Sequence, residues 1–321
     1  MAATELSQST QPSRDPYLES FLSNLGSGRG YSQYTIRNYV TALEEFLQWY
    51  RNQFNTTPNW TAISQETFRL YLRHLGKNNL KPASIRVKFA ALRSFFRFLI
   101  RNGFTSLNPV KTITLPKHRR GLPMFLTKEQ MLRLLNAPFE ELRNLQPNNP
   151  MYKQKAILCY RDAAILETLY SCGLRISELC ALRAMDIDWN NQLVRVQGKG
   201  KKERFVPIGA PALEAIRKYW SLLPTLPTGE QPVFLAKTGS AVSPRDFQRR
   251  LKKYLLQAGL DPAITPHKIR HSYATHLLDA GADLRSVQEL LGHTRVATTQ
   301  IYTHITTQHL KKIYEKTHPR A

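Results

Sequence analysis

The chain has 321 residues, 42% hydrophobic and 10% aromatic, which suffices for a packed core and excludes a disordered tail protein. Its 46 Lys and Arg outnumber 23 Asp and Glu, and the net charge of +23 points to a polyanion, most simply nucleic acid. A membrane partner is not expected, because the sequence has neither an apolar run of about 18 residues nor a basic amphipathic anchor. Three cysteines in apolar helical context, Cys159, Cys172 and Cys180, favour a reducing compartment, the cytoplasm.

Residues 1–15 lack the apolar stretch of a signal peptide and are expected to form a flexible lead. The next segment, 16–107, has apolar residues at helical spacing and predicts an N-terminal four-helix domain. Residues 1–120 hold 17 Lys and Arg against 6 Asp and Glu, so the positive charge is not confined to a single tail. The four helices are predicted over 16–25, 33–53, 64–76 and 82–102.

The last of these helices has one basic face and one apolar face. Its arginines recur at intervals of seven, four and four residues, and its apolar residues Leu92, Phe95, Phe96 and Leu99 occupy the opposite side. No Asp or Glu occurs from Thr67 through Lys128, so phosphate contact is favoured over a merely solvated face. The predicted DNA-binding residues are Arg86, Arg93, Arg97 and Arg101.

Residues 108–126 contain three prolines and a Lys-His-Arg-Arg cluster, which predict an extended basic linker. A second domain, 127–321, begins with a capping box in which Thr127 precedes Gln130 by three residues. Two helices divided at Gly173 follow, and then a hairpin with a lysine-rich turn around 198–200. Further helices are expected at about 211–222, 243–258, 266–279, 283–291 and 297–316. The predicted fold is therefore mainly α in two domains, the second mostly helical with a small antiparallel sheet.

Three local motifs carry little weight. The "GKGKK" turn lacks the spacing of a nucleotide-binding loop. In "HKIRH", His267 and His271 have zinc-ligand spacing, but an arginine stands between them and no glutamate does. The helix–Gly–helix pattern near Gly281 resembles a helix-turn-helix DNA reader, yet that spacing is common in helical proteins.

Six other residues each have an ordinary explanation when taken alone. Arg175 could form a surface ion pair with Glu178, Lys199 could be a solvated turn residue, and His293 could cap a helix. Their order along the chain is more specific. The segments that contain them are "GLRISEL" (173–179), "GKGKKERFVPI" (198–208), "HKIRHSYATHLL" (267–278), "LGH" (291–293) and "TTQIYTH" (298–304).

Taken together over about residues 16–321, these segments resemble the tyrosine recombinases, within them the bacterial Xer type. The resemblance implies an N-terminal SAM-like core-binding domain, a C-terminal catalytic domain and a terminal segment that docks onto a neighbouring subunit. The polar segment 144–158 departs from the family by its length, and no room is seen for an arm-binding domain before residue 16. The family's catalytic pattern falls on Arg175, Lys199, His267, Arg270, His293 and Tyr302.

The resemblance also implies the roles of these residues. Tyr302 would attack the DNA phosphate and leave a 3′-phosphotyrosyl link, with His267 as base and Lys199 as acid toward the 5′-oxygen. The arginines and His293 would stabilise the phosphate, and neither ATP nor a metal cofactor is expected. A helix break after Gly292 fits this assignment, since nine residues of unbroken helix would put His293 and Tyr302 on opposite faces.

The implied partners are a double-stranded recombination site, a homotetramer or a heterotetramer with a paralogous recombinase, and a septum-associated DNA translocase as activator. The implied setting is chromosome or plasmid dimer resolution, hence chromosome partition at cell division. Two alternatives stay open: a type IB topoisomerase, and a DNA-binding regulator without cleavage activity. The target sequence is not readable from the chain, because phosphate contacts carry no base information.

Overall fold

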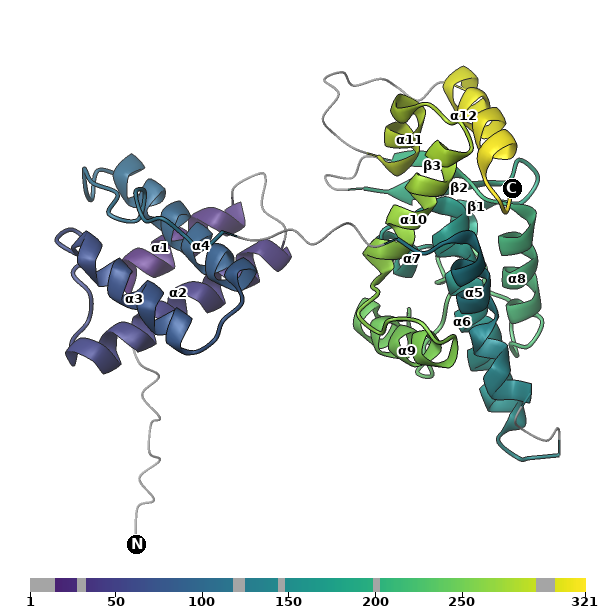
Figure 1. Ribbon diagram of the computed structural model, residues 1–321, viewed down its shortest axis with the longest axis horizontal. Helices are drawn as coiled ribbons and strands as arrows, with labels where there is room; N and C mark the ends of the chain where they lie inside the picture. The colour runs from purple at the N-terminus through teal and green to yellow at the C-terminus, as the bar shows by residue number, and fades with distance from the viewer. Residues whose placement is uncertain (1–14, 28–32, 118–124, 144–147, 199–202, 293–303) are drawn as a thin grey trace, which may run out of the picture. The chain divides into compact units, whose positions relative to one another are not determined.

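The computed structural model describes residues 15–27, 33–117, 125–143, 148–198, 203–292 and 304–321. The chain divides into two compact units, Met1–Gly121 and Leu122–Ala321 (Figure 1). Among the described helices, none combines the length and apolar character needed to cross a bilayer. The predicted division at 108–126 stays a prediction, because 118–124 lie outside the described residues.

The first unit contains the predicted helices, with ends within two residues of those expected: α1 (Pro16–Ser27), α2 (Gln33–Phe54), α3 (Gln65–Lys77) and α4 (Pro82–Arg101). Local chemistry explains two of the starts. The Ser64 hydroxyl accepts from the Thr67 amide at the start of α3, and Pro82 occupies the first turn of α4, where its missing N–H costs nothing. The core is largely aromatic, with Phe46, Phe68 and Phe95 fully buried.

The predicted apolar face of α4 is confirmed. Leu92, Phe95, Phe96 and Leu99 are fully buried in this core. The segment after α4 also packs here through Val110 and Ile113, so the first part of the predicted linker lies on this unit. It is not extended as predicted, because residues 109–112 form a turn in which the Lys111 amide donates to the Asn108 carbonyl.

The second unit is mixed α/β and mostly helical, as predicted. The capping box is present: the Thr127 amide donates to the Gln130 side chain, and the Gln130 amide donates to the Thr127 hydroxyl. Its elements in chain order are α5 (Lys128–Arg143), α6 (Tyr152–Cys172), α7 (Ile176–Cys180), a 3₁₀ turn (Ala184–Asp186), β1 (Ile187–Asp188), β2 (Leu193–Gln197), β3 (Glu203–Pro207), α8 (Ala210–Trp220), α9 (Pro244–Gln257), α10 (Pro266–Asp279), α11 (Leu284–Leu291) and α12 (His304–Thr317).

The two strands of the predicted hairpin are confirmed as β2 and β3, antiparallel with Val194 opposite Val206, while most of the predicted lysine-rich turn lies outside the described residues. The sheet also contains the short strand β1, which pairs with β2 and was not predicted. Two residues are too few for an alternating pattern to show in sequence. Of the last predicted helix, residues 297–303 lie outside the described part, and α12 covers the rest.

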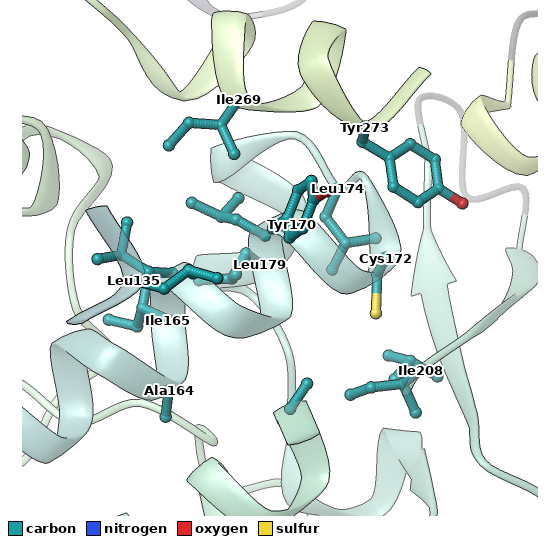
Figure 2. Close-up of a cluster of buried hydrophobic side chains, with 14 of the residues drawn as sticks. Leu135, Ala164, Ile165, Tyr170, Cys172, Leu174, Leu179, Ile208, Ile269 and Tyr273 are labelled. Atoms are coloured by element: carbon teal, nitrogen blue, oxygen red, sulfur yellow. The ribbon is translucent and has the colours of Figure 1, made fainter. Parts of the chain in front are cut away.

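Helix α6 is the centre of the second unit and packs against α5, α8 and α10. Figure 2 shows Leu135 of α5, Ile165 and Tyr170 of α6, Ile208 after β3 and Ile269 of α10 in one buried cluster. The predicted division at Gly173 is confirmed as the left-handed end of α6, at φ +57°.

The C-terminal segment packs on its own unit in this single chain. Leu310 and Tyr314 of α12 are buried in the core of the second unit, and His318 lies against the rings of Tyr170 and Tyr314. Docking of this segment onto a neighbouring subunit stays a prediction.

A close approach at Gly173 gives a stability prediction. A Cβ at this residue would lie 2.5 Å from a ring carbon of Tyr273, whereas Gly259 has a similar φ of +64° and no atom within 4 Å. Gly259→Ala should cost only the left-handed strain, about 1–2 kcal/mol, and Gly173→Ala about 1–3 kcal/mol more from overpacking. Urea denaturation measures both, and equal losses would show that Tyr273 moves aside freely.

Candidate active site

Three of the six predicted site residues lie in the described part of the chain: Arg175, His267 and Arg270. Lys199, His293 and Tyr302 lie outside it, so their placement stays a prediction. Arg175 immediately precedes α7, and His267 and Arg270 lie in the first turns of α10.

Arg270 is buried and joins the ends of two helices. Its Nη1 donates to the Gly173 carbonyl at 2.6 Å, and its Nη2 donates to the Leu291 carbonyl at the end of α11. The last carbonyls of a helix lack partners within the helix and carry a partial negative charge, so a guanidinium is well placed there. Burial lowers the pKa of Arg270 to about 10, with the positive charge of Arg175 as the next cause.

Arg175 is fixed by hydrogen bonds to one carboxylate, and about half of its side chain is exposed to solvent. Its amide donates to Glu178 Oε2 at 2.9 Å and its Nη1 to Glu178 Oε1 at 2.7 Å, while 48% of its side chain stays exposed. The ion pair proposed as the ordinary explanation is therefore present, but it is not a surface pair, since the Glu178 side chain is only 7% exposed.

Glu178 is the centre of the cluster, and sequence reasoning assigned it no role beyond that pair. Arg204 of β3 bonds both of its oxygens, at 3.1 and 2.9 Å, and Arg270 Nη1 lies 3.8 Å from Oε2. Burial raises the pKa of the Glu178 carboxyl, but the hydrogen bonds and charge of Arg204, followed by two hydrogen bonds from Arg175, outweigh burial and hold the pKa below its ordinary value. Glu178 is therefore a carboxylate that fixes arginines.

The cluster has an excess of positive charge. Three guanidinium groups surround one carboxylate, which leaves a formal charge of +2 (three minus one). The exposed His267 lies one turn before Arg270, at the amino-terminal end of α10, where backbone amides favour an anion. Forked donors beside a helix N-terminus suit the oxygens of a phosphate group.

The three undescribed site residues are close in sequence to described parts of this cluster. Lys199 lies between β2 and β3, and β3 carries Arg204. His293 follows Gly292, which lies directly against Arg204. Tyr302 precedes α12, which packs against β3, α10 and α11. These neighbours are compatible with one shared site.

The four arginines predicted to bind DNA have different environments on α4. Arg93 is partly buried and donates to the backbone carbonyls of Val110 and Ile113, at 3.2 and 2.8 Å. Arg86 is exposed and donates to the Pro116 carbonyl at 3.3 Å. Arg97 and Arg101 are exposed and have no ion pair within the described residues. Arg97 and Arg101 are thus the members most available to a partner.

Two family models match the chain. The model of the phage integrase family matches residues 124–309, and that of the phage integrase N-terminal SAM-like domain matches residues 18–103. The first match lies within the second structural unit, and the second match lies within the first unit.

Curated relatives match over nearly the whole chain. The chain is 37% identical to the tyrosine recombinase XerC of Chlorobaculum parvum, covering 98% of this chain and 99% of that protein. It is 39% identical to XerC of Alcanivorax borkumensis, over 95% and 94%. Among solved structures, a lambda integrase tetramer bound to a Holliday junction is similar with a TM-score of 0.64 at 20% identity, covering 93% of this chain and 77% of that one.

Removing the central charge should destabilise the second unit in a pH-dependent way. Glu178→Gln leaves the buried arginines without their carboxylate and should lower the free energy of unfolding by about 3–5 kcal/mol at pH 7. A lowered pKa contributes stability above the unfolded value, about 4.3, and loses it as pH falls through the folded value. The difference from the unsubstituted chain should therefore shrink below about pH 4.3.

Thermal unfolding between pH 3 and pH 8 measures this difference. Glu230→Gln is the matched control, because Glu230 also pairs with an arginine, Arg183, but is 80% exposed. This exposed pair should contribute little to stability. A pH-independent loss in Glu178→Gln would contradict the assigned role of the charge.

Proposed function

The chain belongs to the phage integrase family and is a tyrosine recombinase, an enzyme that breaks and rejoins DNA, and we propose that it does so at specific sites through a 3′-phosphotyrosyl intermediate. The observation that carries the proposal is the arginine cluster around Glu178. It supplies a preformed positive site whose residues coincide with the family's motif positions Arg175 and Arg270.

The arginines counteract the negative charge of the phosphodiester, which is the main barrier to attack. A phosphodiester resists attack because its oxygens are negative, and donors fixed in advance stabilise the charge that develops in the transition state. Arg175, half exposed, presents its free N–H groups to a non-bridging oxygen. Arg270 is fixed by two carbonyls, so its remaining donors need no reorganisation when the phosphate binds.

The covalent step conserves the phosphodiester. The Tyr302 oxygen bonds to phosphorus as the bond from phosphorus to the 5′-oxygen breaks, and a free 5′-hydroxyl leaves. His267 takes the proton of Tyr302, and Lys199 gives one to the departing oxygen. Attack by a 5′-hydroxyl on the phosphotyrosine reverses these changes and rejoins the strand, so the cycle needs no ATP or metal.

DNA binding is assigned to both units. Arg86, Arg93, Arg97 and Arg101 of α4 contact phosphates from the first unit, and the second unit holds the scissile phosphate. Arg86 and Arg93 also bond backbone carbonyls of the first unit, which leaves Arg97 and Arg101 the most available members. The lambda integrase structure, solved as a tetramer on a Holliday junction, supports assembly of four protomers on DNA.

The biological assignment rests on the curated relatives. Their name, XerC, supports resolution of chromosome or plasmid dimers at cell division, in the cytoplasm, alone or with a paralogue and with a septum-associated translocase as activator. Relatives named as recombinases over almost the full length favour this function over a topoisomerase or a regulator without cleavage activity.

The first test is covalent capture. The protein selects its own site from a random-sequence duplex library. That site is rebuilt with a nick close to the scissile phosphate, so that the short fragment that carries the free 5′-hydroxyl is lost after cleavage. The unsubstituted chain should give a protein–DNA adduct on a denaturing gel. Tyr302→Phe should bind the same duplex and give none, because it lacks the attacking oxygen.

The control is Tyr34→Phe, which removes a hydroxyl from a tyrosine that is 74% exposed in the first unit. Its adduct should form at the unsubstituted rate. An adduct with Tyr302→Phe would refute the assigned nucleophile, and binding without any adduct from the unsubstituted chain would favour the regulator.

A second test separates the arginines of α4. Arg97→Gln and Arg101→Gln should each weaken DNA binding and reduce the slope of log affinity against log salt by about one, since each removes a phosphate contact. Arg93→Gln should also lower the thermal stability, by about 1–3 kcal/mol, because two backbone carbonyls lose their donor. Fluorescence anisotropy over a salt series and thermal unfolding measure the two effects.

Arg73→Gln is the matched control for this series. Arg73 is exposed on α3 and pairs with Glu66 at 3.4 Å. Its substitution should leave the salt slope unchanged. Equal slopes for Arg97→Gln, Arg101→Gln and Arg73→Gln would place the DNA on another face.

A further inference from the structure

Arg204 belongs to the arginine cluster, but the proposed reaction gives it no role. It lies on β3, its side chain is 8% exposed, and its Nη1 and Nη2 donate to the two oxygens of Glu178 at 3.1 and 2.9 Å. Such a forked pair fixes both the distance and the plane of the carboxylate. A buried charge is unfavourable unless it is paired. The placement of the Glu178 carboxylate therefore depends on its pair with Arg204.

A second contact joins Arg204 to the end of α11. Gly292 caps that helix in the left-handed conformation at φ +67°, and a Cβ there would lie 2.9 Å from Arg204 Nε and 3.1 Å from Cζ. The backbone of Gly292 therefore lies directly against the guanidinium. Nε is buried and has no hydrogen-bond partner within the described residues, so its contact with Gly292 is one of packing alone.

Through these contacts Arg204 joins parts of the unit that are far apart in sequence. The Glu178 carboxylate accepts from Arg204 at both oxygens, and the same two oxygens accept from the amide and Nη1 of Arg175. The carbonyl of Leu291, the residue before Gly292, receives Arg270. The positions of both Arg175 and Arg270 are thus defined relative to the same β3 side chain.

We propose that Arg204 is a positioning residue for DNA cleavage: its forked bond to Glu178 and its contact with Gly292 set the geometry in which Arg175 and Arg270 meet the scissile phosphate. The inference rests on the proposed function, since it assigns those arginines to a phosphate. Lysine cannot replace Arg204, because a single ammonium reaches one point and cannot match two carboxylate oxygens in a plane.

The test compares two substrates in one enzyme preparation. One is the nicked duplex with its ordinary scissile phosphate, and the other carries a methylphosphonate there, in which a methyl group replaces one charged oxygen. Cleavage of both forms the bond from Tyr302 to phosphorus and releases the 5′-hydroxyl, but the neutral group depends less on the arginines. The rate ratio between the two substrates does not depend on the fraction of folded protein, which cancels.

The variants are Arg204→Lys, which keeps the charge, and Arg204→Gln, which removes it. Both should slow cleavage of the phosphodiester by about 10- to 100-fold, as expected when a supporting partner of a site residue is lost. Both should slow cleavage of the methylphosphonate far less. Arg175→Ala serves as reference, with an expected loss of about 10²- to 10³-fold on the phosphodiester alone.

The matched control is Arg195→Gln. Arg195 lies on β2 of the same hairpin and bonds a different carboxylate, Asp186, at 2.9 Å. Its rate ratio should equal that of the unsubstituted chain, and a changed ratio would mean that any arginine of the hairpin acts this way, which overturns the assignment to Arg204.

The remaining outcomes are decisive as well. Equal losses on both substrates in the Arg204 variants would show a merely structural residue, and a normal ratio in Arg204→Lys would show that only the charge matters; either result overturns the proposal. A rate ratio in Arg175→Ala equal to that of the unsubstituted chain refutes the arginine role in the proposed function. Absence of any adduct from the unsubstituted chain refutes the proposed function, and with it the basis for the role of Arg204.

Discussion

The buried carboxylate of Glu178 is the contact on which the geometry of the second unit depends. Three arginines from three different elements approach it, and without it their mutual repulsion in a site of low polarity would be uncompensated. Each arginine brings its own segment: Arg175 the start of α7, Arg204 the strand β3, and Arg270 the start of α10. One carboxylate thus links three segments that lie apart in the sequence.

Helix termini complete the arrangement. Helices α6 and α11 both end in glycines with positive φ, and the carbonyls at these ends are bonded by the single guanidinium of Arg270. At Gly173 a side chain would meet Tyr273, and at Gly292 one would meet Arg204, so the two glycines are needed for close approach as well as for backbone conformation. The breaks that divide the helices are therefore the places where the site is assembled.

How much of this could be predicted from the sequence depends on the range of the interaction. Periodicity and capping are local, which is why the apolar face of α4, the capping box at Thr127 and the division at Gly173 were all predicted. The bonds of Arg204 to Glu178 span 26 residues, and that of Arg270 to Gly173 spans 97. No local pattern shows such contacts, so the sequence indicates only an ordinary surface partner in Glu178 and no role for Arg204.

The arginines of the two units illustrate how differently one residue type can act. On α4, Arg97 and Arg101 are exposed to solvent, where a phosphate would replace water at little cost. In the cluster, burial lowers the pKa of Arg270, and one carboxylate compensates three cations only in part. The free-energy cost of bringing these cations together is offset when the unit folds, so it does not recur when a ligand binds. The cluster keeps a formal charge of +2 that Glu178 does not neutralise. In the proposed reaction this charge would attract the scissile phosphate, and would attract it more strongly as the phosphate gains negative charge.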